Sequence, residues 1–153
     1  MLHKKLKPFP KDFLWGASTS AYQVEGANLS HGKGPSVQDV KKVPEGTSAL
    51  TVCADFYHRY KEDIALLAEM GYTMFRMSIS WSRIYPKGTE EKPNQAGLEF
   101  YHKVFAELKK YNIEPLVTIC HNDTPLYIEE ELGGWENRNT IALFDKYAKT
   151  ILD

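Results

Sequence analysis

The 153-residue sequence contains only two cysteines and no long apolar run. Cys53 and Cys120 stand far apart and form no CxxC pair, so neither a disulfide framework nor a cysteine-based metal clip is expected. We interpret them as two small buried residues in a reducing cytoplasm. No segment reaches the roughly 18 apolar residues of a membrane span. The basic residues 3–7 lack the apolar stretch that follows in a signal peptide, so no membrane partner is expected.

An excess of charge of one sign is also missing. The chain has 19 Lys and Arg against 20 Asp and Glu, which gives a formal net charge of −1. This balance gives no indication of binding to nucleic acid or to an acidic membrane surface. The segment GKG at 32–34 lacks the P-loop spacing, and the histidines lack metal-ligand spacing. The sequence therefore predicts no cofactor and no metal.

What the sequence does contain is an alternation of short apolar strands and amphipathic helices. The expected strands cover residues 13–18, 73–80 and 115–120. The expected helices cover residues 55–71, 94–111 and 139–151, with N-caps at Asp55 and Asn139 and a C-terminal stop at Gly71. This α/β alternation implies a parallel sheet with right-handed crossovers. A doubly wound sheet and part of a barrel both fit it.

The second expected strand carries a positive charge between apolar side chains. Within residues 74–80 the apolar positions alternate with Arg76, Ser78 and Ser80, which therefore share one face. In a barrel that face points inward, where a guanidinium needs an acidic partner because it cannot lose its proton. On an edge strand the same arginine would be solvated, and the strand pattern alone leaves both alternatives open.

Two further polar side chains follow strand ends. His121 comes directly after the third expected strand, and Gln23 follows the first. Ligands of parallel α/β proteins gather at the C-terminal ends of the strands. An imidazole and an amide can both hydrogen-bond sugar hydroxyls. The alternatives are a histidine that bonds only to nearby backbone and an ordinary polar turn.

Several long segments of the sequence resemble glycoside hydrolase family 1. The similar segments are FLWGASTSAYQVEG (13–26), FRMSISWSRIYP (75–86), HND (121–123) and GGWENR (133–138). The first is similar to the family's N-terminal signature, the second to its second-strand motif and the third to its H-W-D or H-F-D string. Segments 55–71 and 113–121 most resemble the bacterial 6-phospho-β-glucosidases.

The resemblance implies that residues 1–153 are the N-terminal fragment of a single (β/α)8 TIM-barrel domain, with roughly three of its eight units. It implies that Gln23 and His121 hydrogen-bond the non-reducing sugar. It also implies that Arg76 holds the carboxylate nucleophile and keeps it ionised. Asn122, expected to contact the substrate, stands where the family usually has an aromatic residue. Gln38 stands where a tryptophan is common.

Both catalytic glutamates of the family lie in strings that this sequence does not contain. The acid/base belongs to an N-E-P string and the nucleophile to a T-E-N-G string, and retention requires both carboxyl groups. We therefore expect a fragment of a retaining β-glycosidase for β-glucosides or 6-phospho-β-glucosides that is inactive by itself. We also expect self-association through the open edge of the third strand. The alternative is a short non-catalytic protein that binds a sugar or a protein partner.

Overall fold

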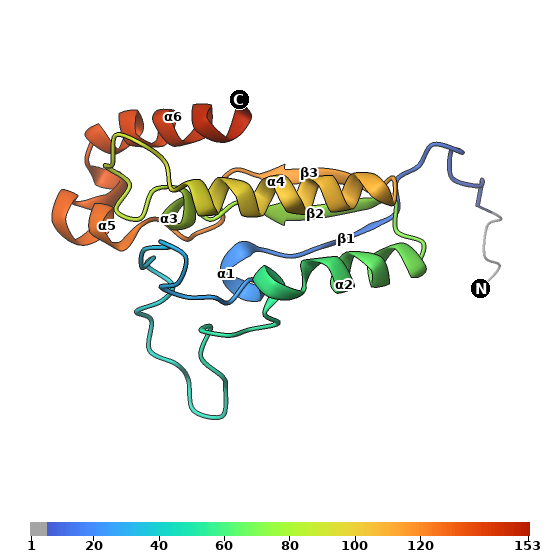
Figure 1. Cartoon of the computed structure of the whole chain (residues 1–153), viewed down its shortest axis with the longest axis horizontal. Coiled ribbons are helices and arrows are strands. Elements are labelled where there is room, and N and C mark those ends of the chain that lie inside the picture. Colours follow the sequence, from blue (N-terminus) through green and yellow to red (C-terminus); the bar gives the residue numbers. More distant parts are fainter. Residues whose placement is uncertain (1–5) are drawn as a thin grey trace.

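The computed structural model describes residues 6–153 and contains a three-stranded parallel sheet (Figure 1). The strands are β1 (Gly16–Ser18), β2 (Met74–Ser78) and β3 (Glu114–Thr118), and their order in the sheet is β1-β2-β3. Ser18 pairs with Arg76, which pairs with Leu116, so these three side chains form one row on one face of the sheet. The strands are those that the sequence predicts, although β1 begins three residues later.

The strand order agrees with a barrel, one of the two architectures that the sequence alternation allows. The connecting helices are α2 (Phe56–Glu69) and α4 (Gln95–Lys110), which pack against each other, and α6 (Asn139–Leu152) follows β3. Right-handed crossovers that always step in the same direction place their helices on the same face of the sheet. A doubly wound sheet also reverses direction and covers both faces, but one half of it, taken alone, has this same strand order. The molecule thus has the strand order and helix placement of three consecutive units of a (β/α)8 barrel.

The core lies between the sheet and these helices. Phe75 and Met77 of β2 are only 2% and 3% exposed, so the predicted apolar face of this strand is confirmed. Each such side chain contributes roughly 1.5–3 kcal/mol by its burial. The hydroxyl of Tyr147 on α6 lies 2.9 Å from the carbonyl oxygen of Ile79 and 2.6 Å from that of Ile119. This contact fastens α6 to the ends of β2 and β3.

The predicted helix ends are partly wrong. Gly71 follows the end of α2 in the left-handed region (φ 80°), as the sequence predicts. Asp55 makes no capping bond, because its backbone is left-handed (φ 55°) and its carboxylate instead contacts Nδ1 of His58 at 2.7 Å. Asn139 is the first residue of α6, and its backbone N–H donates to the side-chain oxygen of Asn137 at 2.9 Å.

Short helical segments follow all three strands, and the sequence pattern does not indicate them. They are α1 (Ala21–Val24), α3 (Trp81–Ile84), α5 (Leu126–Leu132) and the 3-10 turn η1 (Gly134–Glu136). Segments this short carry too few residues for a hydrophobic period to be recognised. Among residues 6–153, no helix combines the length and apolarity that a membrane crossing requires.

Candidate functional site

Three of the four predicted site residues, Gln23, His121 and Asn122, lie beyond the ends of the strands, and Arg76 lies within β2. The arrows of β2 and β3 in Figure 1 point toward the end of the molecule that carries α1, α3 and α5. Ser78, at the end of β2, accepts a hydrogen bond from the backbone N–H of Ala21 at 2.8 Å. This bond holds the start of α1 against the end of β2. Ser78 lies two residues after Arg76, so both side chains are on the same face of the strand.

The segments after β1 and β3 meet through two rings. Gln23 is exposed on α1, and its side-chain oxygen accepts a bond from the Ser20 hydroxyl. The ring of the adjacent Tyr22 stacks on His121, with 5.9 Å between centroids and 29° between planes. Nδ1 of His121 is buried and has no hydrogen-bond partner among the described residues. The structure thus brings Gln23 and His121 to the same end of the sheet, and their binding of sugar stays a prediction.

Arg76 lies in the middle of β2 on the face opposite the helices. It is half-buried between Ser18 and Leu116 in the neighbouring strands. Within residues 6–153 its guanidinium makes neither a hydrogen bond nor an ion pair. Arg76 therefore has no acidic partner within the described part of the chain.

The two positions that depart from the family pattern are in direct contact. Nε2 of Gln38 donates a hydrogen bond to the backbone carbonyl oxygen of Asn122. Asn122 has a left-handed backbone (φ 58°), a conformation that asparagine adopts more readily than bulky residues do. The two departures from the family pattern, Gln38 and Asn122, therefore affect the same part of the candidate site.

A buried charge network beneath these loops was not predicted from the sequence. Nε of Arg83 donates to Oε2 of Glu25 at 2.9 Å, and Nη2 donates to the carbonyl oxygen of Gly26 at 3.1 Å. The Tyr101 hydroxyl donates to the other oxygen of Glu25 at 2.7 Å. The guanidinium also lies over the ring of Tyr57, 4.5 Å from its centroid. The network joins the turn after β1 to α3 and α4.

The protonation states in this network follow from its geometry. Burial has the largest effect and lowers the pKa of Arg83, but the charge and hydrogen bond of Glu25 together with Tyr101 and Tyr57 outweigh it, and the net pKa is raised. Burial and the charge of Glu25 both raise the pKa of Tyr101, which stays neutral and donates. Glu25 lies in segment 13–26 and Arg83 in segment 75–86, each among apolar or small neighbours. A single charged residue in such surroundings is the sequence feature that could have indicated a buried ion pair.

Asp123 is the second buried acid at this end of the molecule. Its side chain is fully buried, Oδ1 accepts a 3.3 Å bond from the His121 backbone N–H, and Oδ2 has no partner among the described residues. Burial is the main cause that raises the pKa of Asp123 to about 6, partly offset by the Ser80 side chain. Burial, followed by the charge of Asp123, raises the pKa of Cys120 to about 12. This thiol therefore stays protonated and does not act as a nucleophile.

The loop that carries Gln38 is held by a second ion pair. Nζ of Lys33 lies 3.1 Å from Oδ2 of Asp39, which also accepts a 2.7 Å bond from the Ser36 backbone N–H. The backbone N–H of Val37 donates to the carbonyl oxygen of Thr124 at 3.0 Å. Burial raises the pKa of Asp39, yet Lys33 and Ser36 more than reverse this and the net pKa is lowered. Lys33, the lysine of segment 32–34, therefore stabilises this loop through its ion pair with Asp39.

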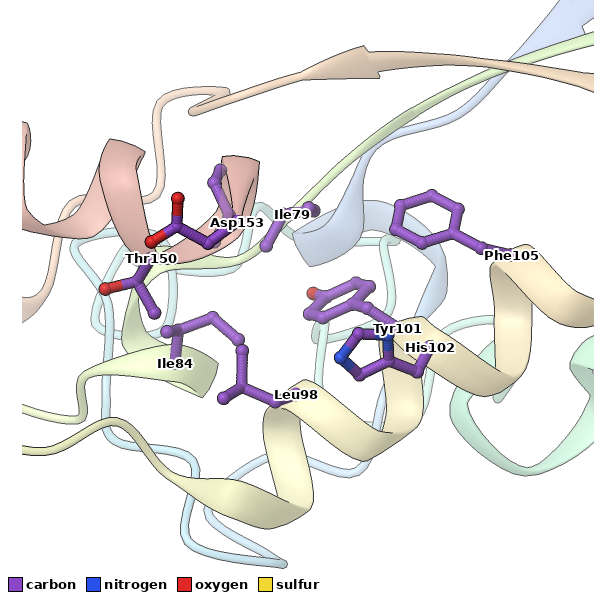
Figure 2. A pocket seen from close by; sticks show the side chains of 9 residues that line it. Ile79, Ile84, Leu98, Tyr101, His102, Phe105, Thr150 and Asp153 are labelled. Atoms are coloured by element: carbon purple, nitrogen blue, oxygen red, sulfur yellow. The ribbon is translucent and has the colours of Figure 1, made fainter.

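A hollow of about 100 Å³ lies away from the predicted site residues, between α4 and α6. Figure 2 shows Ile84, Leu98 and Tyr101 pointing into it. Its lining is largely apolar and includes none of Gln23, Arg76, His121 or Asn122. We interpret it as a gap in helix packing.

Residues 5–153 match the sequence model of the family described as Glycosyl hydrolase family 1. A 6-phospho-beta-glucosidase of Clostridium longisporum is 51% identical over 94% of this chain and 32% of its own length. Beta-glucosidase 9 of Arabidopsis thaliana is 50% identical over 92% of this chain and 28% of its own length. The psychrophilic beta-glucosidase BglU from Micrococcus antarcticus has a TM-score of 0.87 at 44% identity, covering 94% of this chain and 31% of that one. The chain thus spans about a third of the length of these curated relatives.

Proposed function

The chain belongs to glycosyl hydrolase family 1, and from this premise we propose that it forms the sugar-holding part of a retaining β-glycosidase that acts on 6-phospho-β-glucosides. The observation that carries the proposal is the 51% identity, over 94% of the chain, to a 6-phospho-beta-glucosidase. The structure supports it because Gln23 and His121 lie at the strand ends where barrel enzymes bind their substrates. The unpaired Cys53 and Cys120 agree with catalysis in the cytoplasm.

In this proposal the chain holds the substrate and prepares the nucleophile. Gln23 and His121 hydrogen-bond hydroxyls of the non-reducing ring, and Asn122 lies at the edge of that ring. The Arg76 guanidinium faces the carboxylate nucleophile, which is supplied from outside residues 1–153, and keeps it ionised. A second carboxyl group protonates the leaving oxygen while the nucleophile forms a glycosyl-enzyme bond, and water then cleaves that bond.

The isolated 153 residues are proposed to be inactive because their own buried acids at the site are engaged or enclosed. Glu25 is bound to Arg83 and Tyr101, and Asp123 is fully buried. Neither carboxylate can reach a bound glycosidic oxygen without breaking these arrangements. We expect no turnover of p-nitrophenyl 6-phospho-β-glucoside by the isolated chain, and measurable turnover would contradict this part of the proposal.

A chimera tests the proposed function directly. Residues 1–153 replace the matching segment of the Clostridium longisporum 6-phospho-beta-glucosidase, whose remainder supplies the rest of the barrel. We expect the chimera to hydrolyse p-nitrophenyl 6-phospho-β-glucoside. A folded chimera without this activity would contradict the proposal. Activity on the unphosphorylated glucoside alone would leave the family role standing and contradict the phosphorylated substrate.

A further inference from the structure

The imidazole of His121 is held mainly by the backbone that carries it. Its Nδ1 is buried and has no hydrogen-bond partner among residues 6–153. The ring stacks on Tyr22 with 5.9 Å between centroids, a contact that limits its tilt more than its sliding. The place of the ring therefore depends on how firmly the segment after β3 is fixed.

Asp123 bonds to this segment through a single carboxylate oxygen. Oδ1 accepts a 3.3 Å hydrogen bond from the backbone N–H of His121, and the thiol of Cys120 donates to the same atom at 3.8 Å. Asn122, between the two partners, has a left-handed backbone (φ 58°). This conformation folds the chain back so that a short acidic side chain reaches a backbone N–H two residues earlier. One oxygen thus gathers residues 120–123 into a fixed turn.

The base of the Asp123 side chain is itself fixed. Asp123 is 0% exposed, and the next residue, Thr124, is bonded on two sides. Its backbone carbonyl oxygen accepts from the N–H of Val37 at 3.0 Å, and its hydroxyl oxygen accepts from Nε1 of Trp135 at 3.0 Å. A group that orients another must have its own geometry locked, and Asp123 meets this condition.

Asp123 is also an expensive residue for the fold at neutral pH. Oδ2 has no hydrogen-bond partner among residues 6–153, and burial is the main cause that raises the pKa of the carboxyl group to about 6. Above this pH the ionised form lowers the stability of the folded chain. An apolar side chain of similar size would avoid this cost. A buried acid that costs stability beside a candidate site residue indicates a role in that site.

We propose that Asp123 is a positioning residue, whose carboxyl group holds residues 120–123 and thereby sets the place of the His121 ring against the sugar. The inference rests on the proposed function, in which His121 hydrogen-bonds the non-reducing ring. It extends that function by naming the group that aligns His121. Asp123 is enclosed and does not contact the sugar, so it acts only through His121.

A double-mutant cycle in the chimera described above tests this inference. Asp123→Ala and Asp123→Ser both remove the acceptor of the His121 N–H, and the serine variant keeps a polar group in the buried position. We expect each to lower kcat/KM for p-nitrophenyl 6-phospho-β-glucoside about tenfold when His121 is present. In a His121→Ala background we expect the same changes to cost less than about threefold. Asp123→Asn keeps an acceptor oxygen and should stay within about threefold of the parent.

Glu107→Gln is the matched control. Glu107 is a buried carboxylate (7% exposed) on α4, and its Oε2 accepts from Nζ of Lys110 at 2.6 Å. It contacts neither the segment after β3 nor α1 through a hydrogen bond of the described chain. We expect its replacement to change kcat/KM less than about twofold in both backgrounds.

The outcomes separate the inference from the function on which it rests. Equal losses with and without His121 would show that Asp123 acts on the fold alone, and would overturn the inference while the glycosidase function stands. A loss in Asp123→Asn as large as in Asp123→Ala would overturn it too, because the acceptor oxygen is retained. A folded chimera that keeps Asp123 and His121 but does not cleave the substrate would overturn the proposed function and the inference with it.

Discussion

Glu25 and Arg83, 58 residues apart in the sequence, form a buried ion pair with 2.9 Å between Oε2 and Nε. Their side chains are 4% and 0% exposed. The pair joins the turn after β1 to the segment after β2, and so fixes the loop that carries Gln23. The position of a proposed sugar ligand therefore depends on two residues that do not touch the sugar.

Removing one partner of this pair should destabilise the fold strongly. We expect Arg83→Met or Glu25→Gln to lower the free energy of unfolding by about 3–5 kcal/mol, because each leaves a buried charge or polar group uncompensated. Replacing both partners should cost less than the sum of the single changes. Denaturant titration below the concentration at which the protein associates measures these differences.

The exposed pair of Arg59 and Glu62 on α2 is the matched control. Its atoms lie 3.4 Å apart, and its side chains are 56% and 72% exposed. We expect Arg59→Met and Glu62→Gln to change the free energy of unfolding by less than about 1 kcal/mol. Equal effects of the buried and exposed substitutions would contradict the assigned role of Glu25 and Arg83.

Asp123 should make the stability depend on pH in a direction unusual for an acid. Its pKa is raised from 3.8 to about 6 in the folded chain, mainly by burial. As the pH rises from about 4 to 6, the unfolded chain releases this proton while the folded chain retains it, so stability falls. We expect the free energy of unfolding of the parent to fall by on the order of 3 kcal/mol across this window because of Asp123, and Asp123→Asn to abolish this fall.

Unfolding free energies measured across this pH window test the role of Asp123. Asp145→Asn, at an exposed carboxylate 2.7 Å from Lys149, is the control and should leave the Asp123 slope in place. A parallel pH dependence in the parent and Asp123→Asn would show that Asp123 is ionised in the fold throughout.

The free edge of β3 should cause self-association of the isolated chain. Within the described residues β3 pairs only with β2, and its side chains Leu116 and Val117 are 55% and 37% exposed. Open edges with apolar side chains pair with other chains. We expect oligomers in size-exclusion chromatography with light scattering, and fewer of them in Val117→Lys. Ile141→Lys, at an exposed position on α6, should have no such effect. A monomer at all concentrations would refute the association.

The regular elements could be predicted from the sequence because their periods are local. The alternation in residues 74–80 identifies β2 and its buried face, and Gly71 marks the end of α2. The hydrophobic period alone could not predict the barrel, because a doubly wound sheet gives the same alternation of strands and helices. The resemblance to glycoside hydrolase family 1 indicated the barrel, and the strand order β1-β2-β3 agrees with it.

The remaining features depend on contacts between distant residues. No local pattern indicates that Glu25 meets Arg83, or that Gln38 bonds to Asn122 across 84 positions. The capping role predicted for Asp55 was wrong because the backbone there is left-handed, which turns the carboxylate toward His58. Each of these outcomes is set by tertiary packing, which local propensity does not determine.

Arg76 is proposed to hold the nucleophile, and the turnover of the chimera after Arg76→Met tests this role. Loss of the cation should leave the nucleophile with a raised pKa and a poorer position, so we expect kcat to fall by about 10² or more. The acidic limb of the pH–rate profile should move to higher pH, and Arg76→Lys should restore part of the activity. Arg138→Met, at an exposed arginine, is the control. A folded Arg76→Met chimera with near-normal kcat and an unshifted profile would contradict the proposed role of Arg76.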